Sequence, residues 1–261
     1  WEEKFWEPLE VKKAANEAFV TAQTFKTHFK VTTFMHNTVL INGVASHISP
    51  TSIESGTDKV QYTYETIVAK GTVSSIQKIG GYAVSLNHKN TQSAAEKIIH
   101  EALAKGYETL LEEQKDAWAK IWEMSDITIA GDVKAQQGIR FNIFQLNQTY
   151  LGKDSRLNIG PKGFTGEKYG GSTYWDTEAY CIPFYMATKD QKVARNLLTY
   201  RYNQLDKAIE NAKDNLGFKN GAALYPMVTM NGEECHNEWE ITHEEIHRNG
   251  AIAFAIFNYY R

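Results

Sequence analysis

The spacing of apolar residues changes near residue 90, and this change separates two kinds of structure. Before it, apolar side chains alternate with polar ones, as at Val60, Tyr62 and Tyr64. The neighbouring stretches are rich in Thr, Val, Ile and Tyr and are interrupted by glycine. This period of two predicts antiparallel strands. We therefore expect part of a β-sandwich over residues 1–90, although the strands are too few to close one.

After residue 90 the apolar residues follow the period of a helix. From Thr91 to Ser125 they mark one face, with Glu and Lys on the other, which predicts one long connecting helix. Further helices are predicted over four ranges: 134–151, 178–187, 190–214 and 244–260. The C-terminal half is therefore expected to be all-α, built from helix pairs.

The composition excludes several classes of partner. With 28 Lys and Arg against 31 Asp and Glu, the net charge of -3 leaves no cationic surplus for nucleic acid or anionic lipid. No apolar stretch approaches the roughly 20 residues that cross a bilayer, and Trp1 to Lys4 show no signal-peptide pattern. Cys181 and Cys235 are too few for a disulfide framework. We expect a cytoplasmic protein with reduced thiols and no membrane partner.

Two long segments without periodicity interrupt the helical half. Six glycines lie between Gly152 and Thr173, followed by Tyr174, Trp175 and Asp176 at the start of a helix. Residues 221–242 form a second irregular stretch that carries methionine, cysteine, histidine and tryptophan. Loops of this length inside a compact domain are uncommon and usually functional. We expect them to form two walls of a pocket.

Trp175 and Asp176 place a flat apolar ring beside a hydrogen-bond acceptor. Sugars need this pairing, because their C–H faces pack on aromatic rings while their hydroxyls require polar partners. A structural alternative is that Asp176 caps the helix and Trp175 packs on it from outside. The spacing alone leaves both interpretations open.

The run from Glu233 to Glu240 holds four carboxylates, an imidazole and an indole in eight residues. It is followed by His243-Glu244-Glu245-Ile246-His247, which matches the bare H-E-x-x-H pattern of zinc peptidases. No apolar helix frames this motif, and no third ligand can be identified. We therefore expect no metal, and prefer an acidic loop that leads into a helix capped by Thr242. Phosphate-loop and G-x-S-x-G motifs are also missing from the sequence.

Two long strings carry a family resemblance. Residues 156–178, RLNIGPKGFTGEKYGGSTYWDTE, and residues 221–242, GAALYPMVTMNGEECHNEWEIT, closely resemble the disaccharide phosphorylases of glycoside hydrolase family 65, and most of all those that act on maltose. The resemblance implies that residues 1–90 are the C-terminal part of an N-terminal β-sandwich, 91–128 a helical linker, and 129–261 the first helices of an (α/α)6 catalytic barrel.

The resemblance implies inverting phosphorolysis, in which phosphate attacks the anomeric carbon while one protonated carboxyl assists the leaving oxygen. Maltose and phosphate would give β-D-glucose 1-phosphate and D-glucose. Trehalose and kojibiose are alternative substrates, and a non-catalytic carbohydrate-binding module is an alternative of another class. No cofactor is implied besides phosphate as co-substrate. The full-length enzyme would be a homodimer.

The resemblance also assigns residues. Trp175 and Asp176 match the pair that holds glucose in the donor subsite. The acceptor-subsite loop matches these residues: His236, Asn237, Glu238, Trp239, Glu240, Thr242 and Glu244. The general acid of the family lies in a Gly-Pro-Asn-Glu-Tyr-type motif that would follow Arg261. We therefore expect a portion of a longer enzyme, with no catalytic residue in this chain and no activity when it stands alone.

Overall fold

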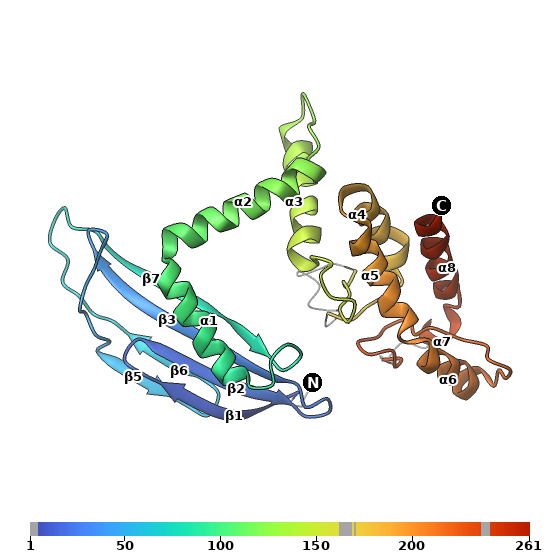
Figure 1. Ribbon diagram of the computed structural model, residues 1–261, viewed down its shortest axis with the longest axis horizontal. Coiled ribbons are helices and arrows are strands. Elements are labelled where there is room, and N and C mark those ends of the chain that lie inside the picture. Colours follow the sequence, from blue (N-terminus) through green and yellow to red (C-terminus); the bar gives the residue numbers. More distant parts are fainter. Residues whose placement is uncertain (1–4, 162–168, 170, 236–240) are drawn as a thin grey trace. The chain divides into compact units, whose positions relative to one another are not determined.

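The structure, a computed structural model, describes residues 5–161, 169, 171–235 and 241–261 (Figure 1). The chain divides into two compact units, Trp1–Asp116 and Ala117–Arg261, which are described separately. Strands occupy the first unit, and the second is helical. This order confirms the predicted change from β to α structure.

The first unit contains a five-stranded antiparallel sheet. Its strands are β1 (Trp6–Lys13), β2 (Glu17–Thr24), β3 (Lys30–Ile41), β4 (Val44–Ala45) and β7 (Ser74–Val84). The long strand β3 pairs with β2 on one side and with β7 along its whole length on the other. The strands β5 (Ser52–Ser55) and β6 (Val60–Thr63) form a separate antiparallel pair.

Helix α1 (Thr91–Lys105) covers one face of the sheet (Figure 1). Ala95 and Ile99 pack against Phe19, Phe34 and Ala83 in a fully buried cluster. The apolar face of α1 thus packs on the apolar face of the sheet. Both faces are predicted by the spacing of apolar residues, with a period of 3.6 in the helix and of two in the strands.

A chain of buried threonine hydroxyls attaches the start of α1 to the sheet. The Thr21 and Thr32 hydroxyls lie 2.8 Å apart, and the Thr32 hydroxyl donates to the Thr91 hydroxyl at 2.8 Å. Buried hydroxyls need such partners, because an unpaired one costs about 1–3 kcal/mol.

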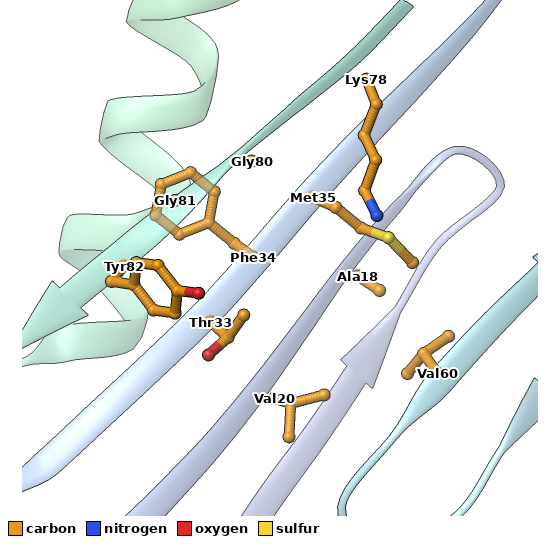
Figure 2. A pocket seen from close by; sticks show the side chains of 10 residues that line it. All are labelled: Ala18, Val20, Thr33, Phe34, Met35, Val60, Lys78, Gly80, Gly81 and Tyr82. Carbon is orange, nitrogen blue, oxygen red and sulfur yellow. The ribbon is translucent and has the colours of Figure 1, made fainter. Parts of the chain in front are cut away.

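The opposite face of the sheet has a hollow of about 340 Å³ (Figure 2). Val20 of β2, Met35 of β3 and Val60 of β6 line it, and Lys78 reaches over it. Tyr82 of β7 also lines the hollow, and 72% of its surface is exposed.

The predicted single helix from 91 to 125 is wrong at one residue. Helix α1 ends at Lys105 and α2 (Tyr107–Ser125) begins two residues later, with Gly106 at φ 79° between them. A positive φ cannot belong to a right-handed helix, and glycine reaches it without the Cβ penalty of other residues.

Further helices follow in the described part of the second unit. They are α3 (Val133–Thr149), the π-helix η3 (Thr177–Cys181), α4 (Ile182–Thr188), α5 (Gln191–Tyr202), α6 (Leu205–Leu216), α7 (Ile241–Glu244) and α8 (His247–Tyr260). The helix predicted over 190–214 is therefore two helices separated at Asn203 and Gln204. The helix predicted over 244–260 begins only at His247. In the part of the chain that the structure describes, no helix is both long and apolar enough to span a membrane.

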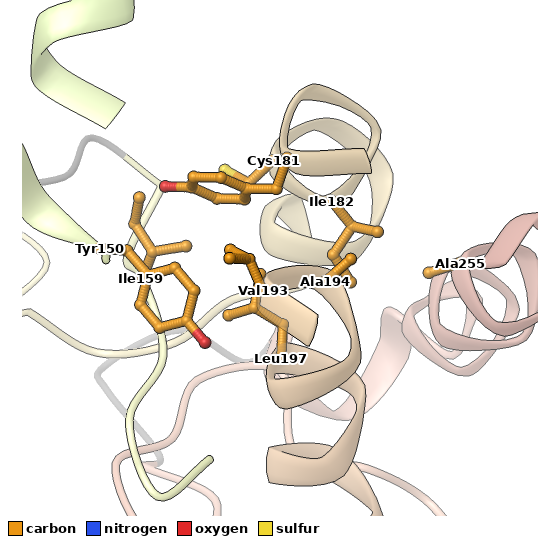
Figure 3. Packing of buried hydrophobic residues seen from close by; sticks show 9 residues of the cluster. Tyr150, Ile159, Cys181, Ile182, Val193, Ala194, Leu197 and Ala255 are labelled. Carbon is orange, nitrogen blue, oxygen red and sulfur yellow. The ribbon is translucent and has the colours of Figure 1, made fainter. Parts of the chain in front are cut away.

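The core of the second unit gathers around α4 and α5 (Figure 3). Its buried members are Tyr150, Ile159, Cys181, Ile182, Tyr185, Val193, Ala194, Leu197 and Ala255. The buried Tyr185 hydroxyl donates to the Leu146 carbonyl at 2.9 Å, which pairs its polar atom. Ile159 enters this core from the glycine-rich segment, so that segment is anchored on the helices.

Gly152 sets the start of that segment against α5. Its φ is +71°, and an added Cβ would lie 2.5 Å from Val193 Cγ1. We expect Gly152→Ala to cost about 2–5 kcal/mol of stability through backbone strain and a core clash together. Gly171→Ala is the matched control, because Gly171 has φ +72° and open space around it. Thermal melting of both variants measures the difference, and equal melting temperatures would refute the clash.

Candidate functional site

The sugar-binding candidates Trp175 and Asp176 lie immediately before the π-helix η3. The Thr177 hydroxyl donates to the Ile159 carbonyl at 2.7 Å, and both residues are buried. This bond fixes the start of η3 to the glycine-rich segment. π-turns are rare and often occur at functional sites.

Asp176 does not use its carboxylate as a helix cap in the part of the chain that is described. Its backbone is already helical, with φ -55° and ψ -31°, and its side chain makes no capping hydrogen bond. A capping residue usually has an extended backbone. The geometry thus gives no support to the interpretation of Asp176 as a capping residue.

The environment of Asp176 disfavours its charge. Burial raises the pKa of this carboxyl, a hydrogen bond from its own backbone lowers it, and the nearby Glu245 carboxylate raises it further. The net direction is upward, above the usual value of about 3.9. A partly buried carboxyl of this kind is a candidate for function.

Trp175 is half-buried and packs against aromatic rings on two sides. Its ring centroid lies 5.0 Å from that of His247, with the ring planes nearly perpendicular at 83°. Tyr180 lies on another side at 6.0 Å, with an interplanar angle of 45°. These contacts restrict the rotation of the indole while part of it stays exposed.

A buried ion pair supports the residues around Trp175. Arg201 Nε donates to Glu178 Oε1 at 2.7 Å, and Nη2 donates to Oε2 at 3.1 Å. Nη2 also donates to the Tyr174 carbonyl at 3.2 Å. The two charged side chains are 2% and 0% exposed. Burial alone would lower the pKa of Arg201, but the Glu178 carboxylate outweighs it and the pKa is raised.

The segment 221–235 lies against this region. Thr173 and Thr229 form an antiparallel bridge with N–H to carbonyl distances of 2.7 and 3.0 Å. Tyr174 packs with Met227 and Val228 in a small buried cluster. The two irregular segments therefore meet, and that they form two walls of a pocket stays a prediction.

A second buried ion pair lies in this segment. Glu234 Oε2 accepts from the Met227 amide at 2.7 Å and Oε1 from the Val228 amide at 3.0 Å. Arg248 Nη1 lies 3.4 Å from Glu234 Oε2 and donates to the Thr242 carbonyl at 2.6 Å. The side chains of Glu234 and Arg248 are 3% and 2% exposed.

The acceptor-loop candidates are only partly visible. His236, Asn237, Glu238, Trp239 and Glu240 lie outside the described residues. Thr242 is buried in α7, with its carbonyl bonded to Arg248. Glu244 is exposed, and its carbonyl accepts from the Ile246 amide at 2.8 Å.

The H-E-x-x-H string does not lie on one helix. Helix α7 ends at Glu244 and α8 begins at His247, so the spacing no longer places the two histidines on one helical face. His247 Nε2 lies 3.9 Å from Glu245 Oε2. Among the described residues, no group of three or more His, Cys, Asp or Glu side chains could hold a metal ion.

Sequence reasoning missed both ion pairs. For Arg201 a signal exists, because Ala194, Leu197 and Arg201 follow one another at helical spacing, which places the arginine on the buried face of α5. A charge at such a position indicates a buried partner. For Arg248 the same signal exists, because Arg248, Ile252 and Ala255 follow one another at helical spacing on the buried face of α8. Glu234 has no comparable pattern, since a loop carboxylate among other acids looks solvent-exposed.

Two family models match the chain. The N-terminal domain of glycosyl hydrolase family 65 matches residues 2–121, and the central catalytic domain of the same family matches residues 140–261. The first match covers the sheet, α1 and most of α2, and the second begins within α3 and extends to Arg261. The chain belongs to glycoside hydrolase family 65.

Individual relatives are disaccharide phosphorylases by name. The maltose phosphorylase of Bacillus subtilis (strain 168) is 44% identical over 99% of this chain and 33% of its own length. The alpha,alpha-trehalose phosphorylase of Thermoanaerobacter brockii is 34% identical over 93% of this chain and 30% of its own. A solved structure of a putative kojibiose phosphorylase from human microbiome superimposes with a TM-score of 0.83 at 28% identity, over 98% of this chain and 33% of its own. The chain thus spans about a third of these relatives.

The raised pKa of Asp176 has a consequence for stability. Because folding raises this pKa, the ionised carboxyl destabilises the fold above the folded-state pKa, and the effect is lost as the pH falls toward the unfolded value of about 3.9. We expect Asp176→Asn to raise the melting temperature at pH 7, with a gap that narrows on acidification. The exposed Asp214→Asn is the control. A melting temperature below that of the parent at pH 7 would contradict this reading.

Proposed function

We propose that the protein carrying this chain is a maltose phosphorylase, which converts maltose and phosphate into β-D-glucose 1-phosphate and D-glucose with inversion. The 44% identity to the Bacillus subtilis enzyme along 99% of the chain supports maltose. The trehalose and kojibiose phosphorylases found by sequence similarity are 34–40% identical over at most 93% of the chain, and the putative kojibiose phosphorylase of known structure is 28% identical.

The arrangement of Trp175 and Asp176 is the observation that carries the proposal. A restrained, half-buried indole lies next to a carboxylate that its own helix does not use. The indole face would pack on the C–H face of the transferred glucose, and the carboxylate would accept from its hydroxyls. Both groups would act in the donor subsite.

The chemical step would need one carboxyl. Phosphate would take the place that activated water has in an inverting hydrolase, so a single general acid would protonate the leaving oxygen. We assign no residue of this chain to that role and place the acid outside it. Without leaving-group protonation, typically about 10²–10⁴-fold in rate, residues 1–261 alone would be inactive.

Two alternatives can be distinguished from this proposal by experiment. A kojibiose phosphorylase is favoured by the fold similarity over 98% of the chain, and a panel of maltose, trehalose and kojibiose with phosphate distinguishes the substrates. A carbohydrate-binding module without catalysis would bind glucose but release no β-D-glucose 1-phosphate from any of them. Phosphate as the sole co-substrate, the homodimer and the cytoplasmic location stay predictions.

Asp176→Asn tests the donor subsite. Charge-assisted hydrogen bonds to the glucose hydroxyls contribute about 1.5–3 kcal/mol each when buried, so their loss should lower kcat/KM for maltose phosphorolysis by more than tenfold. The measurement is the release of β-D-glucose 1-phosphate by the complete protein, with Asp214→Asn as the control. Activity within a factor of two of the parent would remove Asp176 from the subsite.

Exchanging residues 236–244 tests the acceptor subsite. Replacement by the corresponding loop of a trehalose or kojibiose phosphorylase should change the linkage of the disaccharide made from β-D-glucose 1-phosphate and glucose. The donor should stay the same, because Trp175 and Asp176 are untouched. Product analysis by chromatography reads the result, and an unchanged linkage would assign the loop a structural role alone.

A further inference from the structure

Arg248 and Glu234 connect three backbone segments that are far apart in the sequence. Glu234 holds the amides of Met227 and Val228, and Arg248 holds the carbonyl of Thr242. The two side chains approach each other at 3.4 Å. One charge pair thus fixes the described residues on both sides of 236–240.

The position of Arg248 is unfavourable for stability alone. It lies in the first turn of α8, where the helix dipole disfavours a cation. It is almost fully buried, and its Nε has no hydrogen-bond partner among the described residues. Well-packed apolar residues often stabilise a fold as well as a buried ion pair does. Through its contacts with Glu234 and the Thr242 carbonyl, Arg248 fixes the positions of two backbone segments.

We infer that Glu234 and Arg248 are positioning residues that set the affinity for the acceptor sugar. This inference rests on the proposed function. The pair fixes the backbone at Met227, Val228 and Thr242. A shift of about 1 Å in residues that position a substrate can cost about 10²-fold in rate.

The donor side has its own anchor. Arg201 holds the Tyr174 carbonyl next to Trp175, and Glu178 fixes Arg201 through two bonds. Weakening the Glu234 and Arg248 pair leaves this anchor in place, and it reaches the donor residues only indirectly, through the packing of Met227 and Val228 on Tyr174 and of His247 on Trp175. The expected signature is a larger change in the KM for the acceptor sugar than in the KM for the donor.

Glu234→Gln is the first test. Glutamine offers one acceptor oxygen and one NH₂ group, so one of the two backbone amides would face a donor. In synthesis by the complete protein, we expect the KM for glucose to rise about tenfold or more, while the KM for β-D-glucose 1-phosphate changes less than twofold. Initial rates of phosphate release, with each substrate varied in turn, give both constants.

Glu233→Gln is the matched control. It makes the same chemical change one residue earlier, on an exposed carboxylate that pairs with Lys207 at the surface. We expect both KM values to stay at those of the parent. An equal rise of both KM values in Glu234→Gln, or a loss of kcat alone, would overturn the positioning role.

A double variant separates positioning from folding. Glu234→Gln alone leaves the buried Arg248 without the opposite charge of Glu234, which lowers the melting temperature and can prevent folding. Glu234→Gln with Arg248→Gln removes both charges and should regain melting temperature while the KM for glucose stays raised. Recovery of the glucose KM together with stability would refute the inference. A parent that forms no maltose at all would instead refute the proposed function.

Discussion

The bidentate ion pair between Arg201 and Glu178 is the interaction on which the helical unit depends most. It joins the last turn of α5 to the π-helix η3, with both side chains removed from water. Removing one partner of such a pair leaves an uncompensated buried charge, at a cost of about 3–5 kcal/mol. The same guanidinium donates to the Tyr174 carbonyl, so the ion pair also fixes the backbone next to Trp175.

The charge of Arg201 also acts on the second buried ion pair. Burial lowers the pKa of Arg248, the Glu234 and Glu245 carboxylates raise it, and the Arg201 charge lowers it, with a downward net direction. Each guanidinium therefore needs its own carboxylate in place. The backbone bridge between Thr173 and Thr229 joins the segments that the two pairs support. The glycine-rich segment and the segment 221–235 are thus joined to each other, although each is held by its own buried ion pair.

The periodic parts of the structure could be predicted from the sequence, because burial on one face imposes a period of two or 3.6. The β-to-α change and helix α3 follow from that rule. The breaks between helices could not be predicted in this way. The apolar pattern of a helix continues across Gly106 and across Asn203, although the backbone helix ends there. The π-helix η3 could not be predicted from the sequence either, because Thr177 and Glu178 are held by hydrogen bonds to residues that are distant in the sequence.

The H-E-x-x-H string shows how such a break changes chemistry. On a continuous helix, His243 and His247 would share one face and could bind a metal together. The chain instead turns after Glu244, and the Ile246 amide bonds back to its carbonyl. His247 then begins a new helix with its ring against Trp175. Glu245, in the turn itself, acts on Asp176 through its charge. Two residues of an apparent metal motif thus lie beside the candidate sugar-binding residues, because the helix breaks between Glu244 and His247.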